Sequence, residues 1–469
     1  MSGAPSAIAQ AGLAYEILRE SGHDPSLCFQ CKVCTSGCPL ADQMDLAPHA
    51  LMRALQVGRD ARALHANTFW LCASCQACTA RCPQGIDVAR VMDAMRIVAA
   101  RRRIPPRIPE ALFFTQAAMR TVRLFGRLYE VGVGAEVNLR LHRPLREGAH
   151  ALRLLRAGKL RLIPDLPGRP SDRQAPTGEI AYYPGCALHA SAREYDTSTR
   201  AVAEAMGIRL REIDGWRCCG ATAAHQTSAK LAVDLPMANL SLAARGGYAT
   251  VTAPCVACFS RLRAAQVEAE DRAPRGLRVQ HLLHTLLDGG AKAIRGRVTR
   301  PLRGLRVACY YGCLLTRPPG VTGAPNPENP MEMDRLVEAL GGEPVAWSYK
   351  TECCGAGHAV VRPEVVVGLT GRILRNAQAA GAEALAVACP LCHHNLDARQ
   401  DEAARAADTS LMPVFFFTQL MAVAFGLGGP AAGLDRLMVD PRPLLRLRGL
   451  LPSDGQGRRT ESATPAASP

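Results

Sequence analysis

Apolar positions along the chain follow one pattern in the N-terminal part and another beyond residue 178. Early in the chain they recur at helical spacing, and residues 6–20 have the pattern of a short amphipathic helix that Gly22 closes. Farther on, short β-prone apolar runs each precede a cysteine, and they cover Glu179–Tyr183, Tyr248–Thr252, Leu305–Tyr310 and Ala384–Ala388. Helix-like stretches such as Asp196–Met206 and Met331–Leu340 lie between them. The pattern predicts a helical part followed by an α/β part.

An internal repeat organises the α/β part. Three motifs recur: Tyr182-Tyr183-Pro184-Gly185-Cys186 as Tyr310-Tyr311-Gly312-Cys313, Cys218-Cys219-Gly220-Ala221 as Cys353-Cys354-Gly355-Ala356, and Pro254-Cys255-Val256-Ala257-Cys258 as Cys389-Pro390-Leu391-Cys392. The offsets are 127, 135 and 134 residues, so about eight extra residues follow Cys313, where 318–330 has the composition of a loop. Repeated strand, cysteine and helix place the cysteines beyond the carboxyl ends of strands, where helix N-termini favour anionic sulfur.

Cysteine is the anomaly in an otherwise ordinary composition, with 19 residues in a chain of 469. The N-terminus has no basic region followed by an apolar stretch, so no export to an oxidising compartment is predicted. Clustered cysteines in that setting indicate metal ligands rather than disulfides. The longest apolar stretch, Leu411–Leu427, is interrupted by Thr418 and Gln419, and we interpret it as a buried helix. We therefore expect a cytoplasmic protein without a transmembrane segment.

The net charge of +15 is concentrated in one region. Residues 101–173 carry 16 Lys and Arg side chains against 6 Asp and Glu. No interleaved aromatic pattern or binding motif supports a nucleic-acid partner there. The first interpretation is a solvated or partner-facing helical surface, and contact with an acidic partner or a lipid surface is the alternative.

Two cysteine runs in the N-terminal part have the spacing of bacterial ferredoxins. Each reads C-x₂-C-x₂-C-x₃-C-P, and such runs hold cubane [4Fe–4S] clusters in which the fourth cysteine ligates the other cluster. The predicted ligand sets are Cys28, Cys31, Cys34 and Cys82 for one cluster, and Cys72, Cys75, Cys78 and Cys38 for the second. Structural zinc is the alternative, but two complete runs with the same following proline disfavour it. The 33 residues between Cys38 and Cys72 leave room for helices, so we expect an α-helical ferredoxin domain.

Each copy of the later repeat presents five cysteines in the order C…CCG…CxxC. They are Cys186, Cys218, Cys219, Cys255 and Cys258 in the first copy, and Cys313, Cys353, Cys354, Cys389 and Cys392 in the second. Five thiolates exceed the needs of a cubane cluster or a tetrahedral zinc ion. Gly220 and Gly355 supply backbone freedom for close approach. Both sets are therefore predicted to hold metal.

The chain resembles a fusion of the C and B subunits of heterodisulfide reductase, the arrangement of the D subunit of the membrane-linked enzyme. The resemblance is carried by Cys28-Phe29-Gln30-Cys31, Trp70-Leu71-Cys72, Tyr183-Pro184-Gly185-Cys186, Glu194-Tyr195-Asp196, Tyr311-Gly312-Cys313-Leu314-Leu315-Thr316-Arg317-Pro318-Pro319, Thr351-Glu352-Cys353-Cys354-Gly355 and Phe417-Thr418-Gln419-Leu420. It covers about residues 25–430, and the Arg-rich segment least.

The resemblance implies the chemistry of the ten later cysteines. In that family each CCG motif holds a noncubane [4Fe–4S] cluster that engages and splits a disulfide, so these cysteines would be catalytic through bound clusters. An older view of the family places zinc at one CCG site, which stays open as an alternative. The resemblance also implies a flavoprotein or a membrane-bound electron donor as partner, with peripheral membrane association through it.

The sequence thus divides into five predicted segments. They are an α-helical ferredoxin domain at 1–100, an Arg-rich helical linker at 101–177, CCG domains at 178–300 and 301–435, and a largely disordered tail at 436–469. The fold class is a multidomain α+β and α/β protein, with the α-helical ferredoxin domain followed by a duplicated α/β CCG domain.

Several residues near the cysteines have two interpretations. His189, His225 and His358 could reach a substrate or donate a proton, but polar loop residues are the more common case. His393 and His394 could be zinc ligands, and Glu352 could tune a cluster. Arg317 could hold an anionic substrate, with a surface position as the default. Cys309 is interpreted as a core residue rather than a ligand.

Two functions compete. In the first, the chain is an oxidoreductase acting on sulfur groups within a multisubunit complex, and electrons pass from the cubane clusters to the CCG clusters for reversible disulfide/thiol conversion. In the second, it is an electron conduit in a 2-hydroxyacid (glycolate or lactate) oxidase or a quinone-linked complex. Ten complete CCG cysteines favour the first. The disulfide substrate, a small molecule or a protein, is not readable from the sequence.

Overall fold

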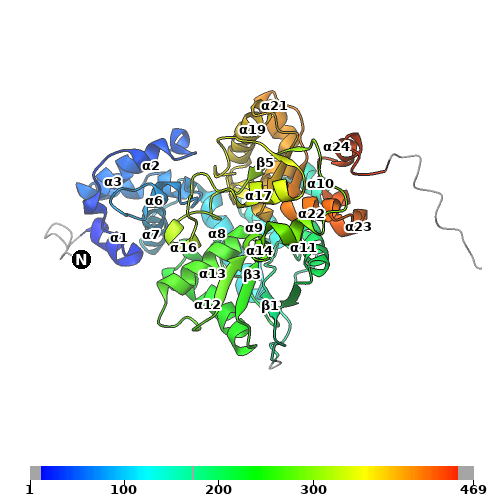
Figure 1. The fold of residues 1–469 in the computed structure, drawn as a ribbon. Coiled ribbons are helices and arrows are strands. Elements are labelled where there is room, and N and C mark those ends of the chain that lie inside the picture. The colour runs from blue at the N-terminus through cyan, green and yellow to red at the C-terminus, as the bar shows by residue number, and fades with distance from the viewer. Residues whose placement is uncertain (1–11, 172–173, 453–469) are drawn as a thin grey trace, which may run out of the picture.

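The computed structural model describes residues 12–171 and 174–452 (Figure 1). Short helices and turns make up its N-terminal part, and no strand occurs in the described residues before Glu179. In chain order these are α1 Leu13–Ser21, η2 Pro25–Leu27, α2 Val33–Ser36, η3 Ala41–Gln43, α3 Pro48–Gln56, α4 Asp60–Leu64, α5 Thr68–Leu71, α6 Ala77–Ala80 and α7 Val88–Arg101. The predicted helix within 6–20 is α1, which ends at Gly22 in the left-handed conformation. Residues 6–11 of that prediction lie outside the described residues.

Helices α1, α3 and α7 form the core of the N-terminal domain. Leu13, Ile17, Leu51, Val91 and Met95 are fully buried there. Complete burial of each such side chain contributes roughly 1.5–3 kcal/mol. The two cysteine runs lie around the short helices α2 and α6, which contact each other, so this core supports both runs.

The Arg-rich segment folds into α8 Pro109–Phe125, α9 Glu130–Arg140 and α10 Gly148–Arg156. Helices α8 and α9 pack through Ala117, Ala118, Val133 and Val137, and Ala223 of the later part joins this cluster. Figure 1 shows these helices running from the N-terminal domain (blue) toward the two sheets. The first interpretation of this segment, a solvated or partner-facing surface, is therefore wrong in part, because one side of α8 and α9 is buried inside the protein.

Two parallel four-stranded sheets of the same topology form the second part of the molecule. Their strand orders are β2-β1-β3-β4 and β6-β5-β7-β8. The strands are β1 Glu179–Tyr182, β2 Arg209–Glu212, β3 Thr250–Ala253, β4 Arg278–His281, β5 Arg306–Tyr310, β6 Glu343–Pro344, β7 Ala384–Val387 and β8 Val414–Phe416. The predicted duplicated α/β fold is confirmed. The four predicted strands are β1, β3, β5 and β7, at the two centres.

Helices connect the strands in both halves. The first half contains α11 Arg193–Ala205, η4 Ala224–Gln226, α12 Ala229–Arg245, α13 Val256–Glu268, α14 Leu282–Leu287 and α15 Gly290–Arg295. The second contains α16 Pro319–Thr322, α17 Glu332–Ala339, α18 His358–Val361, α19 Pro363–Ala379, α20 Pro390–His393, the π-helical turn η5 His394–Ala398, α21 Gln400–Ala407, α22 Phe417–Ala424, α23 Gly429–Ala432, η6 Leu434–Arg436 and α24 Arg442–Leu447.

Two predictions near the C-terminus need correction. The stretch Leu411–Leu427 contains a strand, β8, before its buried helix. The predicted disordered tail at 436–469 begins too early, because α24 is ordered and its Leu445 is fully buried against the core, as is Leu450 just after it. The rest of that tail, 453–469, lies outside the described residues.

A buried group of hydrogen bonds joins the two halves. The Tyr195 hydroxyl lies 3.2 Å from the carbonyl of Pro254 and 3.3 Å from that of Ala388. The His281 Nδ1 accepts the backbone N–H of Leu283, so its Nε2–H is left to donate to the same two carbonyls at 2.7 and 3.3 Å. Because these carbonyls directly precede the two CxxC turns, the group fixes the turns relative to each other.

The His281 hydrogen bonds predict a stability effect. His281→Phe keeps a buried ring but leaves the Pro254 carbonyl short of a donor, and we expect a loss of about 1–3 kcal/mol, measured as a lower denaturation midpoint. His284→Phe is the matched control, since His284 lies on the adjoining helix α14 and contacts Phe259 and His281 only through its ring. Equal midpoints for the His281 variant and wild type would contradict this role.

Candidate metal centres

The two N-terminal cysteine runs share an unusual backbone. Gln30 and Lys32 in the first run, and Ser74 and Gln76 in the second, adopt positive φ values between 50 and 66°. Alternating left-handed residues curl the chain and turn successive N–H groups to one side, which suits an anionic group. The same two positions in each run thus have the left-handed conformation, and the two runs form equivalent turns.

The predicted partition of the first eight cysteines agrees with where they lie, although the ligand assignment stays a prediction. A hollow of about 20 Å³ is lined by Cys28, Cys31 and Cys34 together with Cys82 from the other run. The charges of Cys72, Cys75 and Cys38 all act on Cys78. In both places a cysteine of the opposite run lies near the other three, as the prediction requires.

Burial makes some of these thiols poor acids on their own. It raises the pKa of both Cys38 and Cys72 to about 12. A cationic metal centre would supply the charge that holds them as thiolates. Among the residues that the structure describes, no three Cys, His, Asp or Glu side chains are placed to hold one metal ion.

The first CCG set lies at the carboxyl ends of β1, β2 and β3. Cys186 follows β1, Cys218 and Cys219 lie in the loop after β2, and Cys255 and Cys258 begin α13. The sulfurs of Cys219 and Cys258 are 3.4 Å apart. Five thiols from three strand ends therefore gather at one edge of the sheet.

The second CCG set repeats this arrangement. The sulfurs of Cys354 and Cys392 are 3.6 Å apart. The Gly355 N–H lies 3.4 Å from the Cys353 sulfur, as the Gly220 N–H lies 3.4 Å from that of Cys218. The duplication therefore extends to the hydrogen bonds that the sulfurs accept.

Four glycines are required by the packing of these turns. Gly220 and Gly355, which the sequence singled out, have φ values of +77 and +93°, and a Cβ there would lie 2.6 Å from Ala224 or 2.9 Å from Val366. Gly185 and Gly312 were missed as packing sites. Their Cβ atoms would lie 2.8 and 3.0 Å from the sulfurs of Cys258 and Cys392. The repeated Gly-Cys dipeptide was the available signal.

Two thiol–thiol contacts connect the sets. The Cys75 thiol of the N-terminal domain is close to Cys353, whose hydrogen bond lowers the pKa of Cys75 to about 7. Cys255 and Cys389, the first cysteines of the two CxxC turns, are also in contact, and the hydrogen bond from Cys255 lowers the pKa of Cys389. The second CCG set therefore contacts both the N-terminal cysteines and the first CCG set.

A cavity of about 630 Å³ adjoins the first CCG set but not the second. All five cysteines of the first set line it, together with Cys72. Of the five cysteines in the second set none is among the lining residues, although neighbours such as Leu314, Ala356 and Leu391 are. The duplicated sites thus differ in access.

His225 and His358 lie where the CCG domains meet the N-terminal domain, and both line the cavity. The His358 Nε2–H donates to the Leu71 carbonyl at 2.9 Å, so its buried Nδ1 is an acceptor without a partner. His225 Nε2 lies 3.4 Å from the Ser74 hydroxyl and 3.9 Å from Asp93, and its Nδ1 also has no partner. Burial lowers the pKa of both imidazoles, that of His358 to about 4.

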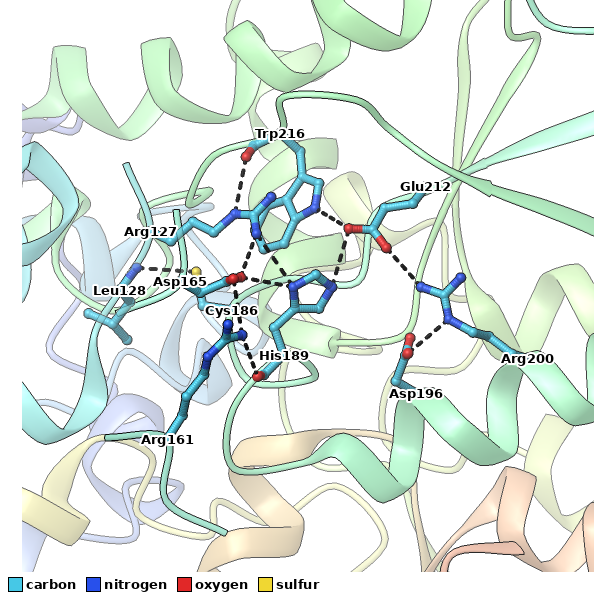
Figure 2. A network of polar contacts seen from close by, with 10 residues as sticks. All are labelled: Arg127, Leu128, Arg161, Asp165, Cys186, His189, Asp196, Arg200, Glu212 and Trp216. Carbon is cyan, nitrogen blue, oxygen red and sulfur yellow. Dashed lines mark hydrogen bonds and ion pairs between the residues drawn. The ribbon is translucent and has the colours of Figure 1, made fainter. Parts of the chain in front are cut away.

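The Arg-rich linker reaches the first CCG set beside Cys186 (Figure 2). The Leu128 N–H donates to the Cys186 sulfur at 3.3 Å. Next to it the Arg127 guanidinium lies 3.6 Å from the centre of the Trp216 ring and pairs with Asp165. Because this arginine is 5% exposed, it belongs to the site rather than to a solvated surface. Its sequence neighbours, Gly126 and Leu128, gave no signal of this burial.

His189 is held between two carboxylates in the same network (Figure 2). Its Nδ1 lies 2.9 Å from Asp165 and its Nε2 lies 3.2 Å from Glu212. Burial opposes its protonation, but the hydrogen bonds and charges of Glu212 and Asp165 outweigh burial and raise its pKa. The same network lowers the pKa of Glu212 to about 2. The two carboxylates therefore favour the protonated form of His189, three residues from Cys186.

Other predicted candidates have structural roles. Arg317 is 2% exposed and binds the Thr351 backbone and side chain and Glu328, so its default surface position is wrong. His393 bonds to the Val414 carbonyl, and Cys309 is fully buried on β5 as a core residue, as expected. The Glu352 carbonyl accepts the Tyr310 hydroxyl.

No helix among the described residues is long and apolar enough to cross a membrane.

Two family models match the chain. A 4Fe-4S dicluster domain matches residues 27–87, and a cysteine-rich domain matches 180–263 and again 307–397. The N-terminal part is therefore a ferredoxin-type domain, and both halves of the second part are cysteine-rich CCG domains.

Curated proteins are similar over the same regions. The 8-methylmenaquinol:fumarate reductase membrane anchor subunit of Wolinella succinogenes is 31% identical over 57% of this chain and 99% of its own length. The B subunit of the ferredoxin/F(420)H(2)-dependent CoB-CoM heterodisulfide reductase of Methanosarcina acetivorans is 26% identical over 55% of this chain and 93% of its own. The iron-sulfur C subunit of the CoB–CoM heterodisulfide reductase of Methanopyrus kandleri is 32% identical over 16% of this chain and 39% of its own.

The duplicated CCG fold, the ferredoxin-type domain before it and these similarities agree with one assignment. The chain belongs to the family of CCG-domain iron–sulfur electron-transfer subunits related to the B subunit of heterodisulfide reductase, in a C–B type fusion.

Proposed function

We propose that the chain is the catalytic iron–sulfur subunit of a heterodisulfide-reductase-like complex. Electrons from two cubane clusters in the ferredoxin domain would serve reversible disulfide/thiol conversion at noncubane clusters in the CCG domains. The single observation that carries this proposal is the 630 Å³ cavity bordered by all five cysteines of the first CCG set. Its lining extends from these cysteines to residues of α8, α9 and α10, beyond the sulfurs that would hold a cluster, so it would leave room for a substrate beside the cluster.

The thiol–thiol contacts support an order of sites. Cys75 contacts Cys353, and Cys389 contacts Cys255. The ferredoxin ligands thus lead to the second CCG set, and that set leads to the first. The second set would act as the relay, and the first would meet the substrate. Bound clusters supply the one-electron chemistry and the iron that engages sulfur.

The chain's own residues would handle protons. Reduction of a disulfide to two thiols takes two electrons and two protons. Asp93 is 7% exposed, lines the cavity, and its buried carboxyl has a pKa raised by burial to about 7, against the nearby charge of Arg96. His225, whose Nε2 lies 3.9 Å from Asp93, has a buried Nδ1 without a partner and also lines the cavity. Asp93 is therefore suited to give a proton to a departing thiolate.

A second candidate function is an electron conduit in a quinone-linked complex. The Wolinella relative is named as the membrane anchor subunit of a methylmenaquinol-linked reductase, and this chain covers 99% of its length. In that case a flavoprotein or membrane subunit would be the partner and the cavity would take no sulfur compound. A glycolate or lactate oxidase subunit is a variant of the same class.

Cluster content is the first test. Protein purified without oxygen should hold about 16 iron atoms per chain, as four clusters of four irons, and little zinc, by elemental analysis. About 12 irons with one zinc would instead support the alternative of zinc at one CCG site.

Removal of a CCG ligand is the second test. Cys219→Ser and Cys354→Ser should each abolish disulfide turnover while the EPR signals of the cubane clusters persist, because the ferredoxin cysteines are untouched. Cys309→Ala is the matched control, a buried cysteine outside every ligand set, and should keep all signals and turnover. Loss of the cubane signals in the Cys219 variant would contradict the proposed division. In wild type, an added disulfide that leaves every CCG signal unchanged would favour the conduit.

The pH profile is the third test. The acid form of Asp93 exists below its pKa of about 7, so disulfide reduction by wild type should fall as the pH rises through that value. Asp93→Asn should lose this inflection and be slower at pH 6, on the order of 10²-fold. Asp42→Asn, an exposed carboxylate of the same domain, should keep the wild-type profile. An unchanged profile in the Asp93 variant would remove Asp93 from the proton path.

A further inference from the structure

Two arginines and one shared carboxylate join the ferredoxin domain to the second CCG domain, and no function described above uses them. Arg81 directly precedes Cys82 in the ferredoxin domain, and Arg317 lies four residues after Cys313. The Glu328 carboxylate binds both arginines. Its Oε1 lies 3.1 Å from the Arg81 Nε, and its Oε2 lies 2.5 Å from the Arg81 Nη2 and 2.7 Å from the Arg317 Nη2. We call Arg81, Glu328 and Arg317 the arginine clamp.

The carboxylate of the arginine clamp comes from the insertion at 318–330, which lengthens the second copy of the repeat. The Thr316 hydroxyl donates to the Pro327 carbonyl at 3.0 Å. The Asn326 side chain accepts the Glu328 N–H at 3.2 Å. These hydrogen bonds hold the carboxylate where both guanidinium groups reach it. The added residues of the second copy thus form a link between the two domains.

Arg317 carries its positive charge in the protein interior. It is 2% exposed, and its Nη1 and Nη2 donate to the carbonyl and the hydroxyl of Thr351, both at 2.9 Å. Its buried Nε–H has no acceptor among the described residues. A buried donor left unpaired costs about 1–3 kcal/mol, so this N–H suits an anionic neighbour such as the sulfur of a bound cluster. Thr351 is two residues before Cys353, which brings the guanidinium to the second CCG set.

The charges of the arginine clamp act where the cysteines of the two domains meet. Arg317 and Arg81 both interact favourably with the thiolate of Cys75, which is in contact with Cys353. Glu352 has the opposite effect on Cys75, and its effect is smaller than that of Arg317. A positive charge near an iron–sulfur cluster favours the reduced form, because that form carries one more negative charge. Burial of the positive charge strengthens this effect, since water screens it less.

We propose that Arg317 sets the reduction potential at the junction of the ferredoxin domain and the second CCG set. Its buried charge stabilises the added electron on the clusters that the sets of Cys75 and Cys353 would hold, and the arginine clamp keeps that charge in place. One electron passes at this junction, so the ferredoxin side is oxidised and the CCG side is reduced. Arg317 touches no substrate and is a positioning residue. The inference rests on the clusters of the proposed function and applies equally to disulfide conversion and to the conduit.

The test uses the full-length chain, purified without oxygen and with its clusters assembled. A redox titration followed by EPR gives the midpoint potential of each cluster signal. Arg317→Met removes the positive charge, Arg317→Lys keeps it, and Glu328→Gln removes the negative charge that the two arginines share. Glu383→Gln is the matched control. Glu383 also lies between two arginines, Arg306 and Arg448, but at the amino ends of β5 and β7, away from the cysteines.

We expect Arg317→Met to shift the balance between the two redox forms at the junction about tenfold toward the oxidised form, a fall of about 59 mV for one electron. Arg317→Lys should stay within about threefold of wild type, since the charge remains. Glu328→Gln should shift the balance the other way, by about threefold, because its side chain is 42% exposed and partly screened. Glu383→Gln should keep the wild-type midpoints.

Opposite shifts in Arg317→Met and Glu328→Gln would identify charge as the cause. Shifts in the same direction would mean that a loosened junction lets water reach the clusters, and this overturns the proposal. A Lys variant shifted as far as the Met variant would make packing the cause, which also overturns it, as do unchanged midpoints. If the buried Arg317 variants do not fold, the sign of the shift in Glu328→Gln decides alone. A wild type that converts no disulfide would count against the proposed function and leave this proposal standing.

Discussion

Two carbonyl groups, those of Pro254 and Ala388, share one pair of buried donors, the Tyr195 hydroxyl and the His281 imidazole. Each carbonyl immediately precedes a CxxC turn, so the shared donors hold both turns at one place in the core. The contact between the first cysteines of the two turns follows from that. The two sheets thus present their cysteine-bearing edges to each other within one shared core.

Duplication gave two sites with the same ligands, but the neighbours of each site decide what it can do. The second set faces the ferredoxin domain through Cys75, and Leu40 packs there against Val365 and Leu369. The first set faces the linker and the cavity. The cysteines of one copy therefore contact two other cysteine sets, while those of the other copy border the cavity. Within the repeat the sulfurs and their glycines are equivalent, so the difference in access comes from the segments that surround the two sets.

The cysteine spacing, the repeat and the central strands were readable because each depends on short local motifs. Strands β2 and β6 were missed because one alternates charged residues, Arg209–Glu212, and the other has two residues. The linker was misread for a different reason: arginine usually marks a surface, yet Arg127 lies buried between Asp165 and Trp216, which come from other parts of the chain. Arg317 is the same case, with its partners Thr351 and Glu328. Such pairings are set by tertiary contacts that no local pattern records.

The π-helical turn after the second CxxC motif has a consequence for how the two copies diverge. In the first copy α13 continues as a regular helix from Val256 to Glu268, whereas in the second α20 widens into His394–Ala398 before α21 begins. A π-turn adds one residue to a helical turn and so rotates everything after it by about 100° relative to an uninterrupted α-helix. Asn395, in this turn, reaches the Cys354 carbonyl and sulfur. The two CxxC motifs thus keep the same cysteines, while one extra residue in the helical turn after the second motif turns the residues that follow it toward different neighbours.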